Sequence, residues 1–416
     1  MKRDTYSYKD FSAASLNINL RDRIKEFQKY IDQSVQNDHK IYWIEANSGL
    51  GPEIEFIAKK TGKTEKKISF IANDYLGMSQ RKETIDAGME AIRKYGTGVC
   101  AAPSIGGFLD IHRKLEDELA LFLGFEAAMI FSTGYGVNSG IISALLSKQD
   151  LAIIDTGVHT SVIDGLRGLN VKMIPHNSIE HLEYLLKREQ NNYMTIMVII
   201  DGIYSQDGDL GPIEEIHALC KEYNALLYID DAHGIGVMGE NGKGSLEYLN
   251  KIGQVDILTG TFSKSFGAIG GFVAGSRQMI QYLKYFANTS IFSASITPQV
   301  TCSVMKALEI IQTEKELRLK LWDNTNYIKK RLYKEGFEIK KSDSPIIPLM
   351  VRDDFKAKEI TRLLWEQGFY ALAIIYPAVR RKEARIRLSI SATHTKEQID
   401  LLVNALNLIN EAIPIK

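Results

Sequence analysis

The sequence predicts an α/β fold in which a mostly parallel, seven-stranded sheet has helices on both faces, followed by a smaller α+β domain. From about residue 66 to 300, short apolar runs alternate with amphipathic stretches, as in parallel sheets built from strand–helix units. After about residue 305 the order changes, because long helices precede the strand candidates. A length of 416 residues also favours a large domain with a smaller one. We therefore expect an N-terminal arm (1–65), a large domain (66–304) and a small domain (305–416).

The strands of the large domain are predicted from apolar runs of strand length. Helical patterns separate several of these runs, for example Ile179–Lys187 and Ile213–Tyr223. The seven predicted strands are Ala127–Phe131, Leu151–Ile154, Val171–Ile174, Thr195–Ile200, Ala225–Ile229, Ile257–Leu258 and Gly271–Ala274.

The two ends of the chain have different patterns. The first 65 residues are polar, with one helical pattern. The C-terminal part alternates long helices with two short apolar runs, which suggests a separate α+β domain. The expected helices are Leu20–Ile31, Val304–Thr313, Glu316–Gly336 and Lys396–Ala412, and the expected strands are Ile346–Met350 and Arg385–Ile390.

Composition excludes several classes of protein. The 51 basic and 51 acidic residues cancel, which gives no support to binding nucleic acid through bulk charge. The three cysteines, Cys100, Cys220 and Cys302, are widely scattered, which favours a reduced, cytoplasmic chain. Met1–Tyr6 leads into polar sequence without the apolar stretch of a secretory signal. No apolar run approaches the roughly 20 residues that cross a bilayer.

The most informative stretch surrounds Lys264, which follows a predicted strand in Thr259–Gly267. Most lysines in turns are solvated surface residues. A lysine becomes a nucleophile when burial and neighbouring positive charge lower the pKa of its ammonium group. The hydroxyls of Thr261 and Ser263 are suited to binding a phosphate beside it. The stretch therefore offers a reactive amine next to an anion site.

Asp230 ends another predicted strand, at the edge where open α/β sheets bind ligands. A carboxylate there can pair with a protonated pyridine nitrogen and keep the ring an electron sink. His233 follows three residues later and could hydrogen-bond a ring hydroxyl or relay a proton. The alternative is that Asp230 only caps the following turn.

Three further strand ends carry suitable groups. Gly134 and Tyr135 lie between a strand and a helix, where free N–H groups and the helix dipole attract anions. His159 could stack on an aromatic cofactor, and Ser205 offers a further polar contact. Each signal is weak alone, but together five strand ends present groups suited to one phosphorylated pyridine. We therefore predict pyridoxal phosphate (PLP) as the cofactor, held as a Schiff base on Lys264, and no metal.

The spacing of these residues resembles that of the α-oxoamine synthases, which are fold-type I PLP-dependent enzymes. The resemblance extends from about Ile68 to the C-terminus, and within the family it is strongest to bacterial serine palmitoyltransferases. The motifs that carry it are Asp155-x-x-x-His159, Asp201-Gly202-Ile203-x-Ser205, Asp230-Asp231-Ala232-His233, Thr261-Phe262-Ser263-Lys264, Asn73–Gly77, Gly96–Gly98, His112-x-x-Leu115-Glu116, Phe292–Ser295, Leu308–Ile311, and Arg387 with Ala392–Thr395.

The resemblance implies a role for each matched residue. Lys264 would carry the cofactor and move protons at the substrate α-carbon, assisted by Asp230 and His233. His159 would stack on the ring, and Ser205 and His233 would contact its oxygen. The phosphate would be held by Gly134, Tyr135 and Thr261, with Ser293 contributed by a partner subunit, and the substrate would be bound by Asn73, His159 and Arg387.

One loop departs from the family pattern. Pro103 stands where the family usually has an arginine, and Phe108 where threonine is usual. That loop lies near the substrate in the family, so the departure leaves the amino acid and the acyl donor open.

The resemblance implies a homodimeric, cytoplasmic acyltransferase that condenses an amino acid with an acyl-CoA or acyl-carrier-protein thioester. We expect serine and a long acyl chain, as in sphingolipid biosynthesis. Glycine, alanine and cysteate are alternatives, with Arg380, Arg381 or Lys382 available for a sulfonate. An aminotransferase on the same fold and a catalytically silent subunit are further readings. A nicotinamide-binding domain is disfavoured, because no G-x-G-x-x-G opens a helix after the first strand.

Overall fold

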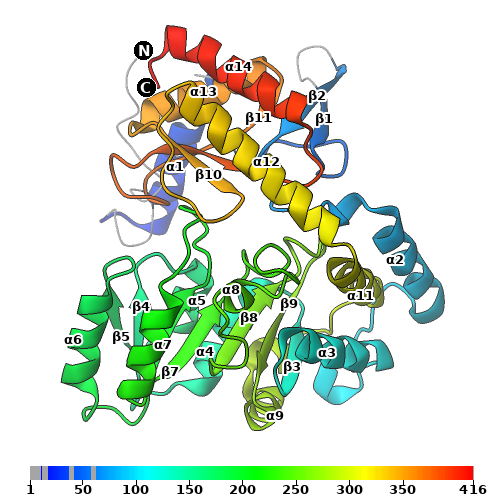
Figure 1. The fold of residues 1–416 in the computed structure, drawn as a ribbon, viewed down its shortest axis with the longest axis vertical. Helices are drawn as coiled ribbons and strands as arrows, with labels where there is room; N and C mark the ends of the chain where they lie inside the picture. Colours follow the sequence, from blue (N-terminus) through cyan, green and yellow to red (C-terminus); the bar gives the residue numbers. More distant parts are fainter. Residues whose placement is uncertain (1–10, 12–16, 37–41, 58–61, 416) are drawn as a thin grey trace. The chain divides into compact units, whose positions relative to one another are not determined.

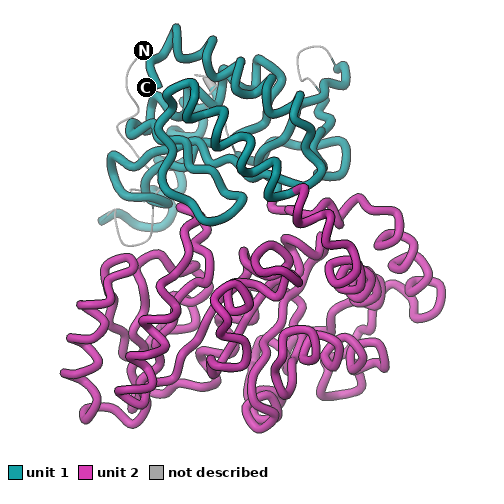
Figure 2. Tube along the Cα trace, in the orientation of Figure 1, with its two compact units in different colours: residues 1–72, 321–416 teal, residues 73–320 magenta. Residues whose placement is uncertain are grey.

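In the computed structural model, the chain forms two compact units: residues 1–72 with 321–416, and residues 73–320 (Figure 2). The structure describes residues 11, 17–36, 42–57 and 62–415. Met1–Tyr6, on which the prediction about a secretory signal rests, lies outside the described residues.

The unit of residues 73–320 is built on a seven-stranded sheet with the order β3-β9-β8-β7-β6-β4-β5 (Figure 1). Strand β9 runs antiparallel to β3 and β8, and the other neighbouring pairs are parallel. The strands are β3 (Ala127–Phe131), β4 (Leu151–Asp155), β5 (Asn170–Ile174), β6 (Ile196–Asp201), β7 (Leu226–Asp230), β8 (Ile257–Thr261) and β9 (Gly271–Gly275). The predicted sheet is confirmed, and each predicted strand agrees with the observed one to within a few residues.

Helices cover both faces of this sheet. Helices α4 and α5 lie on one side, where Val137, Ile141 and Val162 join a buried apolar cluster with strand residues such as Ile154 and Ile199. Helix α7 lies on the opposite side (Figure 1). The helices of this unit are α2 (Lys82–Tyr95), α3 (Asp110–Leu123), α4 (Gly134–Leu145), α5 (Thr160–Gly165), α6 (Ile179–Glu189), α7 (Ile213–Glu222), α8 (Ser245–Tyr248), α9 (Arg277–Phe286), α10 (Asn288–Ile291) and α11 (Pro298–Thr313).

The connections explain which helix covers which face. The crossover between parallel strands is right-handed. Two connections that cross the strand order in opposite directions therefore place their helices on opposite faces of the sheet. From β4 to β5 the chain moves one way through α5, and from β5 through β6 to β7 it moves back through α6 and α7. The carboxyl ends of the parallel strands are left open for a binding site.

The other unit combines two small sheets with four helices among its described residues. One sheet has the order β1-β2-β11 and the other β10-β13-β12. The elements are α1 (Leu20–Gln36), β1 (Glu53–Ile57), β2 (Thr64–Ser69), α12 (Lys315–Lys334), β10 (Ile346–Met350), α13 (Asp354–Glu366), β11 (Phe369–Tyr370), β12 (Leu372–Ile374), β13 (Arg385–Ser389) and α14 (Lys396–Ala412), with the first turns of α12 belonging to the larger unit.

The units divide the chain differently from the predicted boundaries after residues 65 and 304. Strand β2 pairs with β11, so the N-terminal segment joins the C-terminal part in one unit. Helix α11 packs closely on α2, so residues 305–320 belong with the large sheet. The sequence reading also overlooked β1 and β2, because the segment Thr64–Ser69 is polar and only its last residues are buried.

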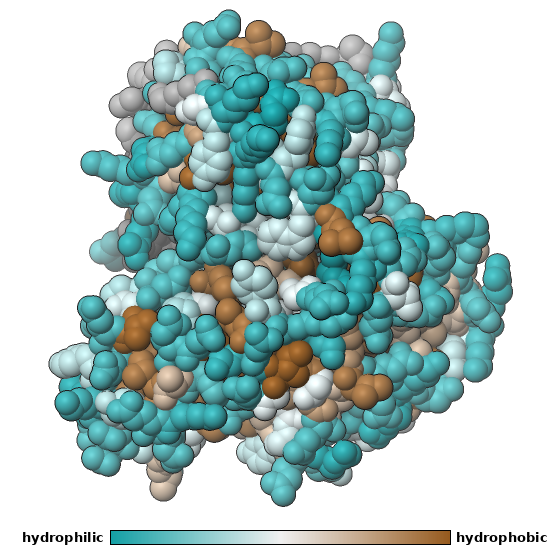
Figure 3. Space-filling view, viewed as in Figure 1, coloured by the Kyte–Doolittle hydropathy of each residue, from teal (hydrophilic) through white to brown (hydrophobic). Residues whose placement is uncertain are grey.

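The surface of the larger unit is mixed in character. On the face seen in Figure 3, small hydrophobic patches lie among hydrophilic side chains. Among the described residues, no helix combines the length and apolar character needed to cross a membrane.

Candidate active site

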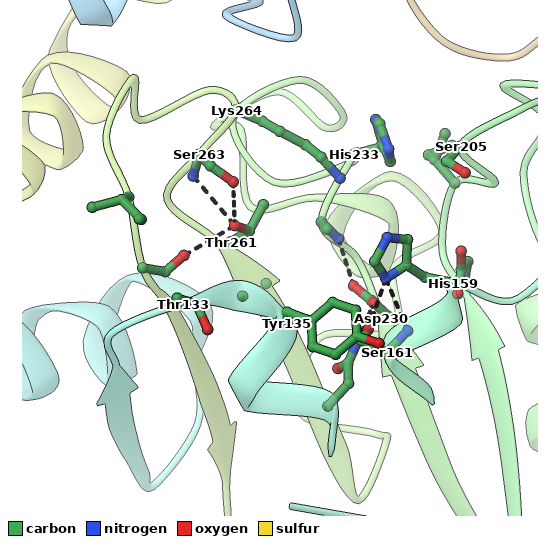
Figure 4. A pocket seen from close by; sticks show the side chains of 18 residues that line it. Thr133, Tyr135, His159, Ser161, Ser205, Asp230, His233, Thr261, Ser263 and Lys264 are labelled. Carbon is green, nitrogen blue, oxygen red and sulfur yellow. Dashed lines mark hydrogen bonds between the residues drawn. The ribbon is translucent and has the colours of Figure 1, made fainter. Parts of the chain in front are cut away.

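A cavity of about 370 Å³ lies at the carboxyl ends of the parallel strands in the larger unit. The residues that line it come from segments that follow β3, β4, β6, β7 and β8, as predicted from the five strand ends (Figure 4). Eight predicted site residues line this cavity: Gly134, Tyr135, His159, Ser205, Asp230, His233, Thr261 and Lys264.

Asp230 is held at the end of β7 by two donors. Asn138 Nδ2 donates to Asp230 Oδ2 at 2.6 Å, and the backbone N–H of Ala232 donates to Asp230 Oδ1 at 3.1 Å. The side chain of Asn138 is itself fully used, because its Oδ1 accepts from the Tyr228 hydroxyl at 2.7 Å and from Thr259 Oγ1 at 3.1 Å. This network fixes the orientation of a buried carboxylate that faces the cavity.

His159 follows β4 and caps the N-terminus of α5. Its Nδ1 lies 2.7 Å from Ser161 Oγ, which also accepts from Asn138 Nδ2 at 2.9 Å. Burial is the main reason that the pKa of His159 lies below its ordinary value; Asp230 opposes this shift and Lys264 adds to it. His159 therefore presents a neutral ring, linked to Asp230 through a chain of hydrogen bonds that runs through Ser161 and then Asn138.

Asp201, at the end of β6, adds a second buried carboxyl group to the same wall. Complete burial raises its pKa well above the ordinary value, and the charge of Asp230 raises it further. Asp201 is therefore a weaker acid than an ordinary aspartate, and it lines the same cavity as Asp230.

The opposite side of the cavity is suited to an anion. The Oγ1 of Thr133 caps α4 by accepting from Gly136 N–H at 2.9 Å, and Thr261 Oγ1 lies 2.8 Å from Ser263 Oγ. A Cβ atom at Gly134 would lie 2.6 Å from Thr261 Oγ1, so only glycine fits this turn without a shift of Thr261. Hydroxyls and a helix N-terminus thus converge at one end of the cavity.

Lys264 extends from the loop after β8 toward the side of the cavity that holds Asp230, His159 and His233 (Figure 4). On that side His233 is positioned by Tyr75, whose hydroxyl lies 2.7 Å from His233 Nδ1. The same hydroxyl lies 3.4 Å from Asn73 Oδ1. The predicted residue Asn73 therefore lies beside His233 without lining the cavity.

Two other predicted residues do not line the cavity. Ser293 is half-buried in the segment after α10, where its Oγ donates to the Ala294 carbonyl at 3.3 Å. Arg387 lies on β13 in the other unit, where its Nη1 donates to Ser389 Oγ at 2.7 Å. The roles of both residues stay predictions.

The sequence reading did not assign a role to several residues of the site. A polar residue inside the apolar helix Gly134–Leu145 is the signal that could have identified Asn138. Tyr75 lies within a motif that was recognised, but its contact with His233 joins residues far apart in the chain. The cavity residues to which no role was assigned from the sequence are Thr133, Asn138, Ser161, Asp201, Ile203, Ala232, Gly260 and Ile269.

The two departures from the family pattern, Pro103 and Phe108, line a separate cavity of about 330 Å³. Two cations lie over the Phe108 ring, with the Arg113 guanidinium 4.9 Å and the Lys284 ammonium 5.0 Å from its centre. Ser132 lines this second cavity and Thr133 the first, so the turn after β3 separates the two.

The residues of the first cavity fit PLP. The carboxyl group of Asp230, held in place by Asn138, suits a protonated pyridine nitrogen, and the ring of His159, whose pKa is lowered, suits stacking on the cofactor. The hydroxyls of Thr133, Thr261 and Ser263 surround a turn that a Cβ atom at Gly134 would fill. Lys264 supplies the amine between these two ends.

Comparison with known proteins agrees with this chemistry. The family model described as aminotransferase class I and II matches residues 65–406. A serine palmitoyltransferase of Bacteroides thetaiotaomicron is 40% identical over 381 residues, which cover 91% of this chain and 94% of that protein. An 8-amino-7-oxononanoate synthase of Thermoanaerobacter pseudethanolicus is 38% identical over 350 residues, covering 84% and 89%. The chain belongs to the α-oxoamine synthases, within the aminotransferase class I and II family.

Solved structures of the family extend this conclusion. The structure of serine palmitoyltransferase from Sphingomonas wittichii superposes with a TM-score of 0.89 at 29% identity, covering 95% of this chain and 99% of that one. A serine palmitoyltransferase carrying PLP as its internal aldimine gives a TM-score of 0.90 at 29% identity, covering 96% and 100%. This α-oxoamine synthase is thus a PLP-dependent acyltransferase of fold type I, as the sequence predicted.

Proposed function

We propose that this α-oxoamine synthase condenses serine with a long-chain acyl thioester. In the reaction, the amino acid α-carbon loses a proton and forms a bond to the acyl carbon, while the bond from that carbon to sulfur breaks and releases the thiol. The bond to the original carboxylate then breaks to give carbon dioxide, and a proton returns to the α-carbon. The product is an α-amino ketone. The observation that carries the proposal is the convergence of Lys264, Asp230 and His159 on one cavity.

The residues of the cavity divide this work. PLP supplies an electron sink for the charge that develops at the amino acid α-carbon. Asp230, held by Asn138, keeps the pyridine nitrogen protonated. Lys264 anchors the cofactor and removes and returns the proton at the α-carbon. His233, oriented by Tyr75, and Ser205 hydrogen-bond the ring oxygen. His159 packs on the ring face as a neutral imidazole.

Six further residues complete the proposal. Gly134, Tyr135 and Thr261 bind the phosphate, and Ser293 reaches the same group from the partner subunit of a homodimer. Ser293 is half-buried in the single chain and lies between the exposed residues Phe292 and Ala294, which suits such a role. Asn73, which accepts a hydrogen bond from Tyr75 outside the cavity lining, contacts the substrate, and Arg387 binds the substrate carboxylate as a planar fork. A cytoplasmic location and a part in sphingolipid synthesis belong to the same proposal.

Serine is preferred because relatives named serine palmitoyltransferase cover nearly the whole chain. The second candidate is the reaction of 8-amino-7-oxononanoate synthases, since relatives with that name reach similar identity. Glycine and cysteate remain further candidates for the amino acid, and CoA and carrier protein for the thiol.

The test is a panel of serine, glycine, alanine and cysteate with palmitoyl-CoA, measuring thiol release and product mass. Serine is expected to release thiol and give a product that has lost carbon dioxide. Lys264→Ala is expected to abolish turnover with folding intact, while the exposed Lys148→Ala serves as the matched control. Formation of a keto acid without thiol release would instead indicate an aminotransferase. A protein that gains no visible absorbance with PLP would indicate a silent subunit.

A further inference from the structure

We propose that His176 is a positioning residue, which bridges Asp155 and Asp209 and thereby holds the two loops that carry His159 and Ser205. The proposal rests on the proposed function only for the roles of His159 and Ser205. His176 follows β5 and does not line the catalytic cavity. No sequence motif recognised above includes it.

The bridge uses both nitrogens of the imidazole ring. Nδ1 lies 2.9 Å from Asp155 Oδ1, and Nε2 lies 2.9 Å from Asp209 Oδ2. The neighbouring Asn177 strengthens both ends, because its backbone N–H donates to Asp155 Oδ2 at 2.6 Å and its Nδ2 donates to Asp209 Oδ2 at 2.9 Å. The ends of β4 and β5 and the loop after β6 are thus connected through one side chain and its neighbour.

The first connection leads to His159. Asp155 Oδ1, which accepts from His176, also accepts from the backbone N–H of Gly157 at 2.6 Å. A Cβ atom at Gly157 would lie 3.1 Å from His176 Nδ1 and 3.0 Å from the Tyr204 ring, so the backbone here packs closely on the bridge. Gly157 lies two residues before His159. The bridge therefore fixes the turn from which His159 enters the cavity.

The second connection leads to Ser205. Asp209 and Tyr204 face each other in a tight loop, in which Tyr204 N–H donates to the Asp209 carbonyl at 3.0 Å and Gly208 N–H to the Tyr204 carbonyl at 2.8 Å. The Tyr204 ring packs edge-on against the His176 ring, with centres 4.4 Å apart. Ser205 is the next residue and lines the cavity. Both ends of this loop therefore contact the bridge.

Charge explains why a histidine is suited to this place. Burial lowers the pKa of His176, but its hydrogen bonds to Asp155 and Asp209 outweigh this and raise the pKa to about 10. The ring is therefore protonated at neutral pH and donates at both nitrogens. A neutral ring could donate at only one, and the other nitrogen would face a carboxylate oxygen as acceptor against acceptor.

A bound metal ion is the competing explanation. His176, Asp207 and Asp209 offer atoms within 4.8 Å of one another, close enough to hold one. In the bridge, Nε2 lies 2.9 Å from Asp209 Oδ2, a direct hydrogen-bonding distance that needs no ion between the two atoms. The experiment separates the two explanations.

The experiment compares His176→Gln and His176→Arg with the wild type in the full chain. Glutamine removes the charge, whereas arginine keeps a cation with several donors. His217→Gln is the matched control, because His217 is buried on α7 and the pKa of its ring is lowered, so it carries no charge to lose. The measurements are amide hydrogen exchange and the dissociation constant of PLP from visible absorbance.

His176→Gln is expected to speed exchange at residues 155–161 and 202–209, with residues 226–230 and 257–261 unchanged, and to weaken PLP binding about tenfold. His176→Arg should stay closer to the wild type in both measurements. The control His217→Gln should match the wild type. Equal exchange in His176→Gln and the wild type would overturn the proposal. It would also be overturned if the purified wild type held stoichiometric metal whose removal by a chelator loosened the same segments.

Failure of the proposed function would look different. If the wild type did not bind PLP, exchange in the chain without cofactor would still show whether residues 155–161 and 202–209 depend on His176. Exchange therefore tests the bridge, and PLP binding tests its consequence for the site.

Discussion

Asn138 offers a sharp test of the hydrogen-bond network under Asp230, because Asn138→Asp changes one donor into an acceptor at nearly constant shape. Asn138 is 3% exposed, and its Nδ2 donates to Asp230 Oδ2 at 2.6 Å and to Ser161 Oγ at 2.9 Å. Its Oδ1 accepts from Tyr228 and Thr259, and those two bonds remain possible in the variant.

The expected loss follows from these contacts. A hydrogen bond to a charged group contributes about 1.5–3 kcal/mol net. In the variant that bond is replaced by two carboxyl oxygens facing each other, so we expect a destabilisation of about 2–4 kcal/mol at pH 8. Because the free energy of unfolding is typically about 5–15 kcal/mol, the variant should still fold but be less stable than the wild type.

The pH dependence has a definite sign. Repulsion from Asp230 and burial raise the folded-state pKa of the new carboxyl group above its value in the unfolded chain. Such a group destabilises the fold at pH values above its pKa in the unfolded chain. The destabilisation ends as pH falls, because a proton is then shared between the carboxyl oxygens of residue 138 and Asp230. The stability difference from the wild type should therefore shrink between pH 8 and pH 5.

The assay is urea unfolding at both pH values, together with PLP binding followed by visible absorbance. Asn404→Asp, on the exposed face of α14, is the matched control and should change stability by less than about 0.5 kcal/mol. PLP binding by Asn138→Asp is expected to weaken about tenfold at pH 8. The reasoning is refuted if Asn138→Asp unfolds at the wild-type urea concentration at pH 8 and binds PLP with wild-type affinity.

Three further predictions concern other parts of the site. Tyr75→Phe removes the hydroxyl 2.7 Å from His233 Nδ1 and should shift the pH profile of kcat with little change in KM; an unchanged profile would count against a positioning role. Gly134→Ala should weaken PLP binding at least tenfold, measured by absorbance, because the new Cβ would lie 2.6 Å from Thr261 Oγ1. His176→Gln should lower the free energy of unfolding, measured with urea, by its full amount below about pH 6.5. The difference from the wild type should disappear as pH rises toward 10, since the pKa of His176 in the folded state is raised to about 10.

The last prediction depends on the groups that face His176. These are the carboxylates of Asp155, Asp207 and Asp209 and the phenol of Tyr204. Burial raises the pKa of Tyr204 well above its ordinary value, so the phenol stays neutral across the range. A stability difference that stays constant from pH 6 to pH 10 would contradict a charged bridge.

The sheet and the polar ends of its strands could be predicted because both are local properties of the sequence. An apolar run followed by a polar residue, as in Leu226–Asp230, indicates both the strand and the edge where its last side chain lies. Parallel strands then bring Asp230 and Thr261 to the same edge without further information. The antiparallel direction of β9 was not predicted, because it depends on pairing with β3 across the whole domain.

The supporting residues of the site could not be predicted in the same way. Asn138 contacts Asp230 across 92 positions of the chain, and Tyr75 contacts His233 across 158. Such pairs depend on the fold that brings them together, and one sequence alone gives no sign of which distant residues meet. His176 illustrates the same limit, because a histidine after a strand is common, and only the two carboxylates beside it give it a charge.

The most direct test of the whole account is borohydride reduction of the protein with PLP, followed by peptide mapping. Reduction fixes the pyridoxal group on the lysine that carries it. A Schiff base on Lys264 should give one adduct, on the peptide that contains this lysine, and none in Lys264→Ala. An adduct on another lysine, or none in the wild type, would contradict it.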